Sequence, residues 1–275
     1  MEKLLFGTAG IPVGTKPRNT LEGIKQVKKL GLGCMELEFV RSINISDKKA
    51  PEVRKLAKQE NVLLSAHAPY FINLNAVDPE KRKASIGRIL NSARILNLCG
   101  GWSVCFHAGF YMGMPHDKVY QSVRESLEAI TEALKTEGIK LWVRPEIGGK
   151  PTSWGSLEEI IKISQELEGV QPCIDWAHLH ARSLGKNNSY SEFAAVLETI
   201  EKGLGKEALK NMHCHAEGIE FGPKGERSHS NLGSSLNYQD LMKALKDFSV
   251  KGVLISESPN IEGDALLMKK VYDSL

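Results

Sequence analysis

Short apolar runs alternate along the chain with longer stretches in which apolar residues recur at positions i, i+3 and i+4. The short runs predict β-strands at Lys3–Phe6, Cys34–Leu37, Leu63–Ala66, Ser103–Phe106, Lys140–Val143, Val170–Ile174, Leu209–Met212 and Val253–Ser256. The longer stretches have the period of amphipathic helices, which we expect at Leu21–Leu30, Pro51–Glu60, Lys81–Leu98, Asp117–Lys135, Leu157–Glu166, Tyr190–Lys202, Tyr238–Phe248 and Gly263–Leu275. Successive strands begin roughly 30 to 45 residues apart, which is the size of a β–α–β crossover.

Eight consecutive strand–helix units, without a break in composition, predict an α/β fold: one (β/α)₈ TIM barrel that spans residues 1–275 as a single domain. A doubly wound open sheet accommodates the same alternation and is the alternative. The chain contains no G-x-G-x-x-G after the first strand and no G-x-x-x-x-G-K-S/T, which weakens nucleotide-binding folds. Ser156, followed by Leu-Glu-Glu, predicts the N-cap of a helix.

Composition and charge bear on the cellular location of the protein and on its partners. Charged residues interrupt every apolar stretch, so no segment reaches the roughly 18 apolar residues that a membrane helix needs. The N-terminal segment has too short an apolar core for a signal peptide, and we expect a cytoplasmic monomer without membrane partners. The net charge of +3 neither requires nor excludes a polyanionic partner. The five cysteines form no C-x-x-C pair and are expected to be buried free thiols.

Seven of the eight histidines fall at strand ends or in the segments that follow strands, and carboxylates occupy the same level. The carboxyl ends of barrel strands converge on one mouth, where crowded carboxylates are costly unless cations neutralise them. Imidazole with carboxylate suits Zn²⁺, with Mn²⁺ or Fe²⁺ as alternatives. The residues concerned are His67, His107, His178, His180, His213, His215 and His229, with Glu36, Glu38, Glu146, Asp175 and Glu257.

Some members of this set have more than one interpretation. Glu36 and Glu38 share one strand face, so either can support a ligating imidazole or lie exposed at the mouth. His180 lies two residues beyond His178 in a predicted loop, and we expect it to support a ligand or to contact phosphate. His213 and His215 share strand parity, so both can face inward and the choice of ligand between them stays open.

The motifs that carry these residues resemble endonuclease IV, the zinc-dependent apurinic/apyrimidinic endonuclease, along essentially the whole chain. Seven segments match in order, each at a strand end or in the loop after it. They are Ser65-Ala-His67-Ala-Pro-Tyr70, Phe106-His107-Ala-Gly109, Arg144-Pro-Glu146, Pro172-Cys-Ile-Asp175-Trp-Ala-His178, Asn211-Met-His213, Glu226-Arg-Ser-His229 and Ser256-Glu257-Ser-Pro259.

The resemblance implies three metal ions, zinc in the first instance and manganese as an alternative. Glu146 would bridge the first two ions. Glu226 is assigned to the third by its chemistry, because the Asp-x-His spacing of the family places Arg227 at the acid's position and Glu226 is one residue earlier. The implied ligands are His67, His107 and Glu146 for the first ion, Asp175, His213 and Glu257 with Glu146 for the second, and His178, His229 and Glu226 for the third. His215 is the alternative to His213.

The resemblance also implies a reaction, the hydrolysis of the phosphodiester 5′ to abasic sites in duplex DNA during DNA repair. Glu146 and Glu257 would be catalytic, with the metal ions activating water and neutralising the phosphate while Glu257 orients or deprotonates the attacking water. Tyr70 matches a position that the family uses to penetrate DNA near the extruded nucleotide, and extrusion costs least where the base is already missing.

Two other classes of function remain open. A xylose-isomerase-like sugar isomerase or epimerase shares the barrel and uses a Glu–Asp–His–Glu metal core, which Glu146, Asp175, His213 and Glu257 can supply. Such an enzyme does not need the remaining imidazoles as ligands. A barrel that only binds DNA or another partner has no use for paired carboxylates at its strand ends.

Overall fold

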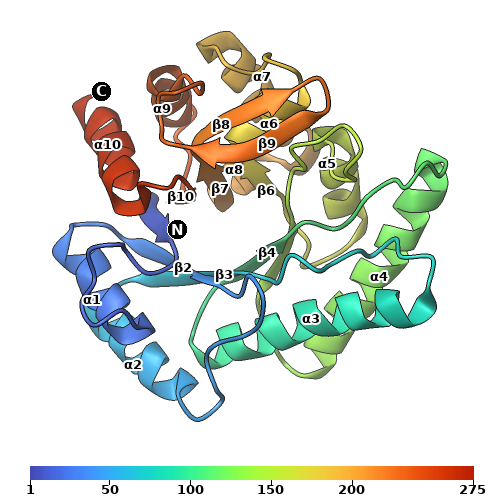
Figure 1. Cartoon of the computed structure of the whole chain (residues 1–275), viewed down its shortest axis with the longest axis horizontal. Coiled ribbons are helices and arrows are strands. Elements are labelled where there is room, and N and C mark those ends of the chain that lie inside the picture. Colours follow the sequence, from blue (N-terminus) through green and yellow to red (C-terminus); the bar gives the residue numbers. More distant parts are fainter. The chain divides into compact units, whose positions relative to one another are not determined.

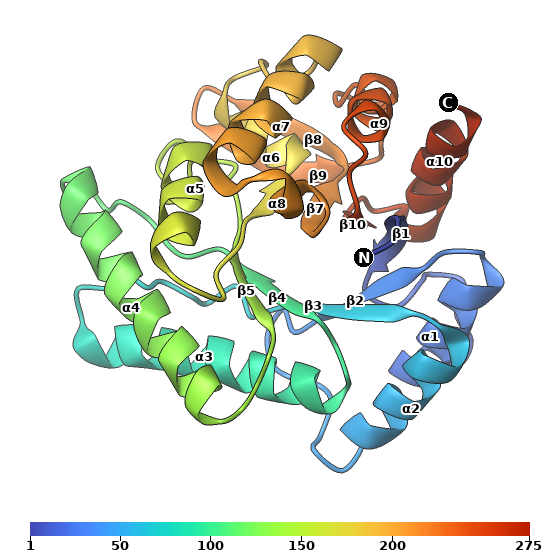
Figure 2. The same cartoon turned by 180° about the vertical axis from the view of Figure 1, so that it is seen from behind.

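The computed structural model describes all residues, 1–275, and Figures 1 and 2 show it from opposite sides. Its strands are β1 (Leu4–Ala9), β2 (Cys34–Glu38), β3 (Leu63–His67), β4 (Ser103–Phe106), β5 (Trp142–Pro145), β6 (Cys173–Asp175), β7 (Met212–Ala216), β8 (Gly218–Gly222), β9 (Gly225–Ser230) and β10 (Gly252–Ser256). Its helices are α1 (Thr20–Lys29), α2 (Ala50–Glu60), α3 (Pro79–Leu98), α4 (His116–Thr136), α5 (Leu157–Glu166), α6 (Trp176–Arg182), α7 (Tyr190–Leu204), α8 (Lys206–Leu209), α9 (Tyr238–Asp247) and α10 (Ile261–Ser274).

The predicted alternation of strands and helices is confirmed. Eight strands form one sheet in the order β5-β4-β3-β2-β1-β10-β7-β6, and β8 and β9 form a separate two-stranded sheet. None of the helices is both long and apolar enough to cross a membrane. All five cysteines are buried free thiols, as predicted.

The chain divides into two compact units. The terminal unit comprises Met1–Met35, Gly148–Pro151 and Cys173–Leu275, and the central unit comprises Glu36–Ile147 and Thr152–Pro172. The prediction of a single domain over residues 1–275 stays a prediction.

In the terminal unit, β10 pairs in parallel with β1 on one side and with β7 on the other, and β7 pairs in parallel with β6. Helix α6 packs against the antiparallel hairpin of β8 and β9 (Figure 1). Ala177 and Ala181 of α6 form a buried cluster with Ile219 of β8, against which Phe221 packs. This cluster attaches the hairpin to the segment that carries His178.

In the central unit, β4 pairs in parallel with both β3 and β5. Helices α3 and α4 pack side by side, as both views show (Figures 1 and 2). Strand β4 is buried along its whole length. Such a strand reads as a continuous apolar run rather than an alternating one, which is why Ser103–Phe106 is predicted to the residue.

Three local predictions need correction. The seventh strand is Met212–Ala216 rather than Leu209–Met212, because Leu209 ends the short helix α8. His178 and His180 lie in helix α6 rather than a loop, since Asp175 caps that helix with its side chain. The long segment after the seventh strand is not a loop, because most of it forms the β8–β9 hairpin.

The predicted N-cap at Ser156 is confirmed as a capping box. The Ser156 hydroxyl accepts a hydrogen bond from the Glu159 N–H at 3.2 Å, and the Glu159 carboxylate accepts one from the Ser156 N–H at 2.9 Å. Both bonds satisfy backbone N–H groups that have no partner within the helix.

Replacing Ser156 with Ala should lower the free energy of unfolding by about 1 kcal/mol, because the N-terminus of α5 loses its cap. The matched control is Ser164→Ala in the same helix, whose hydroxyl donates only to the Ile160 carbonyl, a bond that adds little to helix stability. Urea unfolding followed by circular dichroism measures both changes. Equal losses in the two variants would contradict the role of the cap.

Candidate metal centre

Three side chains meet at the carboxyl ends of β3, β4 and β5 in the central unit. His67 is the last residue of β3, and His107 and Glu146 directly follow β4 and β5. The Glu146 Oε2 atom lies 3.1 Å from His67 Nε2 and 3.4 Å from His107 Nε2. The three ligand atoms all lie within 4.8 Å of one another, which makes the group able to hold a metal ion.

The ring of His67 is oriented by its own backbone. Its Nδ1 atom lies 2.8 Å from the Ala68 carbonyl oxygen, so Nδ1 carries the proton and donates it there. The lone pair is then on Nε2, which faces Glu146. A backbone carbonyl that fixes the tautomer of an imidazole in this way is typical of metal ligands. Glu146 is fully buried, whereas 40% of the His107 side chain is exposed, so the group is open on the histidine side.

Glu36 is buried and supports the central unit from β2. Its Oε2 atom accepts a hydrogen bond from the Ser65 hydroxyl at 2.7 Å and one from the Cys105 thiol at 3.4 Å. These contacts hold Glu36 inside the central unit, and its support of a ligating imidazole stays a prediction. Glu38, two residues later, is partly exposed.

A second set of ligands lies at the strand ends of the terminal unit. Asp175 ends β6 and is in register with His215 of β7, while Glu257 directly follows β10. Ligand atoms of Asp175, His215 and Glu257 lie within 4.8 Å of one another. The His215 Nδ1 atom is 3.3 Å from Glu257 Oε1. Asp175 and His215 are both fully buried.

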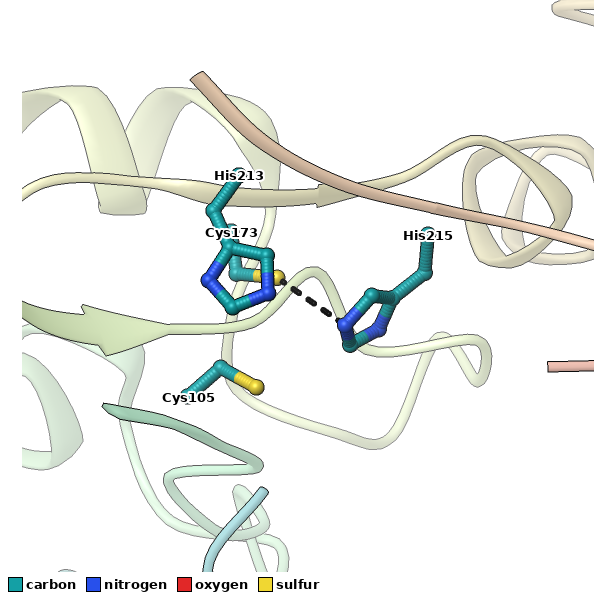
Figure 3. A group of neighbouring side chains, drawn as sticks. All are labelled: Cys105, Cys173, His213 and His215. Atoms are coloured by element: carbon teal, nitrogen blue, oxygen red, sulfur yellow. Dashed lines mark hydrogen bonds between the residues drawn. The ribbon is translucent and has the colours of Figure 1, made fainter. Parts of the chain in front are cut away.

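The structure separates the two histidines of β7. His213 is in register with Cys173 and Val253, two residues before the level of Asp175, and two strand residues span about 6.6 Å. The Nε2 atom of His215 faces the Cys173 sulfur at 3.8 Å (Figure 3), and its Nδ1 atom faces Glu257. The geometry therefore favours His215 over His213 as the ligand beside Asp175 and Glu257.

A third set of ligands joins α6 to the β8–β9 hairpin. Asp175 accepts a hydrogen bond from the His178 N–H at 2.7 Å, and its Oδ2 atom lies 3.1 Å from His178 Nδ1. The His178 Nε2 atom is 3.4 Å from Nε2 of His229 and 3.6 Å from the Glu226 carboxylate. The two imidazoles therefore face each other, and Glu226 lies beside His178.

Glu217 belongs to this set and was not among the predicted site residues. It directly follows β7, is fully buried, and neither of its carboxylate oxygens has a hydrogen-bond partner. Its Oε1 atom lies 3.9 Å from His229 Nε2. Burial raises its pKa well above the usual range, and the nearby Asp175 and Glu257 raise it further. The available signal was a carboxylate directly after a strand, which the misplaced seventh strand concealed.

The two remaining candidate residues, His180 and Tyr70, lie outside the three sets of ligands. His180 is buried, its Nδ1 atom lies 2.8 Å from the Lys186 carbonyl oxygen, and its ring packs edge-on against Phe221. It therefore supports the β8–β9 hairpin, and its burial disfavours contact with phosphate.

Tyr70 lies in the segment after β3 with its side chain in solvent. Its backbone N–H donates to the Val40 carbonyl at 3.2 Å, and its ring lies 4.1 Å from that of Phe71 between centroids. Tyr70 is 49% exposed and Phe71 is 53% exposed. Two adjacent aromatic rings are thus held outside the fold by an anchored backbone.

The chain matches known proteins along nearly its whole length. A family model described as "Xylose isomerase-like TIM barrel" matches residues 24–273. The Methanocaldococcus jannaschii protein named "Uncharacterized protein MJ0133" is 41% identical over 273 residues, which cover 99% of this chain and 98% of the relative. "Probable endonuclease 4" of Mycoplasma genitalium is 26% identical over 215 residues, covering 75% of this chain and 71% of the relative.

Solved structures share the fold at lower sequence identity. Endonuclease IV of Thermus thermophilus has a TM-score of 0.71 at 20% identity, covering 98% of each chain. A D-tagatose 3-epimerase-like protein has a TM-score of 0.73 at 17% identity, covering 98% of this chain and 96% of the other. The predicted TIM-barrel fold and the resemblance to the endonuclease IV family are confirmed, and sugar epimerases share the same fold.

We expect His215→Gln to lower the affinity for zinc by more than about tenfold, the range for disturbed metal ligation. His213→Gln should leave zinc affinity close to that of the wild type, because His213 lies deeper along the same strand. Zinc titration of the chelator-treated protein measures both, with circular dichroism as the check on folding. The reverse order of effects would assign the ligand to His213.

Proposed function

Because the chain belongs to the xylose isomerase-like TIM-barrel family, we propose that it is a metal-dependent phosphodiesterase of DNA repair, which cleaves duplex DNA 5′ to abasic sites. Relatives named "Probable endonuclease 4" support this function, including that of Natranaerobius thermophilus, which is 27% identical over 86% of this chain. The motifs that match the endonuclease IV family lie at the strand ends, where TIM barrels carry their active sites.

The observation that carries the proposal is the surplus of imidazoles. A sugar isomerase or epimerase needs one Glu–Asp–His–Glu set, which contains a single histidine. Four further histidines lie in groups that can hold metal ions, namely His67, His107, His178 and His229. Several ions suit a reaction in which both the attacking and the leaving oxygen of a phosphodiester carry charge.

The ligand sets of the two units have complementary roles in this proposal. Bound zinc or manganese ions would supply Lewis acidity, which neutralises phosphate oxygens and lowers the pKa of water. His67, His107 and Glu146 of the central unit would hold one ion, and Asp175, His215 and Glu257 of the terminal unit another.

Glu257 is the best placed of these groups to handle a proton. Its side chain is 13% exposed, whereas those of Glu146 and Asp175 are fully buried. The His215 imidazole and the His229 ring lie beside its two oxygens, at 3.3 Å and 3.8 Å. Glu257 would therefore orient the attacking water and accept its proton.

Exposed side chains of both units supply contacts that suit DNA. Tyr70 and Phe71 of the central unit would enter the duplex at the abasic site, where no base has to be unstacked. Lys224 lies exposed between β8 and β9, and Arg227 lies exposed on β9, where both would contact phosphates. A pocket built for a small sugar has no need of a solvent-exposed aromatic pair.

The second candidate is a sugar epimerase, which several structural relatives favour. They include a 3-keto-D-glucoside 4-epimerase of E. coli, with a TM-score of 0.70 at 15% identity, covering 98% of this chain and all of the other. Likeness of this degree extends to the barrel, and one barrel supports many unrelated reactions. The two candidates differ in substrate class, which an activity assay separates.

We expect the zinc-loaded protein to cleave a duplex 5′ to a single abasic site and to leave a 3′-hydroxyl. Chelation should abolish cleavage and added zinc or manganese should restore it, because no side chain of the site replaces a Lewis acid. Gel electrophoresis of an end-labelled duplex measures the product, and an undamaged duplex is the control. A panel of ketoses is tested in parallel, and epimerisation without strand cleavage would reject the endonuclease.

Tyr70→Ala should weaken binding of the abasic duplex by about tenfold or more, since stacking on an aromatic ring contributes about 1–3 kcal/mol per base. Zinc content should not change, because Tyr70 lies outside the ligand groups. The matched control is Leu98→Ala, also exposed in the central unit but placed before the amino end of β4. Fluorescence anisotropy measures affinity, and equal affinities in the two variants would remove Tyr70 from the DNA surface.

A further inference from the structure

The group formed by His178, Glu217 and His229 lies within the terminal unit, and its three ligand atoms lie within 4.8 Å of one another. We propose that these residues hold a divalent cation and that Glu217, not Glu226, supplies its carboxylate ligand. The proposal concerns metal binding by three residues of one unit, so it does not depend on the identity of the substrate.

The tautomers of the two histidines support a cation between them. His229 Nδ1 lies 3.4 Å from the Glu257 carbonyl oxygen, and His178 Nδ1 lies 3.1 Å from the Asp175 carboxylate. Oxygen atoms accept hydrogen bonds, so each Nδ1 carries a proton and each Nε2 presents a lone pair. The two Nε2 atoms face each other at 3.4 Å, and two lone pairs at this distance repel unless a metal ion or a shared proton lies between them.

The separation of these nitrogens suits zinc. Zn²⁺ binds imidazole nitrogen at about 2.0–2.1 Å in tetrahedral geometry, which places two ligand nitrogens about 3.3 Å apart. The observed distance between the Nε2 atoms of His178 and His229 is 3.4 Å. Two imidazoles and one carboxylate also form a ligand set that suits zinc, and three protein ligands leave a fourth position for water or substrate.

Burial distinguishes Glu217 from Glu226. Glu217 is fully buried and neither of its oxygens accepts a hydrogen bond. A buried carboxylate without hydrogen bonds is costly unless a cation compensates it. Its Oε1 atom is 3.9 Å from His229 Nε2, so a metal ion beside both imidazoles would also neutralise this charge.

Glu226 lies beside His178 and is partly exposed. Its carboxylate lies 3.6 Å from His178 Nε2, and 23% of its side chain is exposed, so water can solvate it without a metal ion. The Glu226 carboxylate also lies against Gly149, where an added Cβ would come within 2.5 Å of Oε2 and 2.8 Å of His178 Cδ2. Glycine at this position leaves room for Glu226 above the imidazole.

The experiment compares Glu217→Gln with the matched variant Glu226→Gln in the full-length protein. Each protein is equilibrated with zinc, freed of excess metal by gel filtration, and analysed for zinc per chain by mass spectrometry. Glu217→Gln should lose about one ion relative to the wild type, and Glu226→Gln should lose none. His229→Ala should lose the same ion, so the double variant of Glu217→Gln and His229→Ala should lose no more than either single variant.

A thermal shift gives a second readout that does not depend on activity. Zinc added to the chelator-treated wild type should raise the melting temperature, since a ligand that binds the native state stabilises it. The zinc-induced rise in melting temperature should be smaller in Glu217→Gln than in the wild type, and in Glu226→Gln it should equal that of the wild type. If Glu217→Gln does not fold, Glu217→Asp shortens the side chain by one methylene and should weaken zinc binding at one site by at least tenfold, while Glu226→Asp should not.

Wild-type zinc content in both Glu217 variants would overturn the proposal. Loss of an ion from Glu226→Gln alone would assign the carboxylate to Glu226. An unchanged zinc content in His229→Ala would show that the facing imidazoles share a proton rather than a metal ion. None of these outcomes depends on cleavage of DNA, so failure of this proposal is distinguishable from failure of the proposed function.

Discussion

The cost of burying a carboxylate is the constraint on which the site depends. Glu146, Asp175 and Glu217 are fully excluded from solvent, and an ionised carboxylate in such a place destabilises a fold unless it is paired or bound to a cation. Each of the three has an imidazole within 4 Å. Imidazoles that present lone pairs do not neutralise a negative charge, but together with the carboxylates they form groups that could hold a metal ion.

Backbone geometry prepares these side chains before any ligand binds. Parallel pairing puts Asp175 and His215 in register on neighbouring strands. The Ala68 carbonyl sets the tautomer of His67, and the Glu257 carbonyl does the same for His229. Metal sites depend on such surrounding contacts nearly as much as on the ligands themselves. Binding of an ion would therefore cost little conformational entropy, because contacts with the protein already orient these rings.

The barrel fold and the chemical groups at its strand ends carry different information about function. Sugar epimerases and an endonuclease IV share the fold of this chain with similar TM-scores, so the fold alone does not identify the substrate. The groups that favour the proposed endonuclease lie at the strand ends or in the segments that follow them. They are the histidines His67 and His107, the β8–β9 hairpin with His229, and the exposed pair of Tyr70 and Phe71.

Periodicity in the sequence determined the order of strands and helices. It also determined that most candidate ligands lie at or just after strand ends. The period of an element is a local property, so Ser103–Phe106 and Leu157–Glu166 follow from their own residues, as does the cap at Ser156. The same reasoning failed at Leu209–Met212, because a short apolar run is compatible with either a helix or a strand, and there a short helix runs directly into β7.

Tertiary structure alone decided the details of the site. The depth of His213 relative to His215 depends on the register between β6, β7 and β10, which is a contact between distant segments. Glu217 became a candidate ligand only when its complete burial and its distance from His229 were known. The sequence determined which chemical groups are present and near which strand ends they lie. Register and burial, which arise from non-local packing, decided which of those groups face one another.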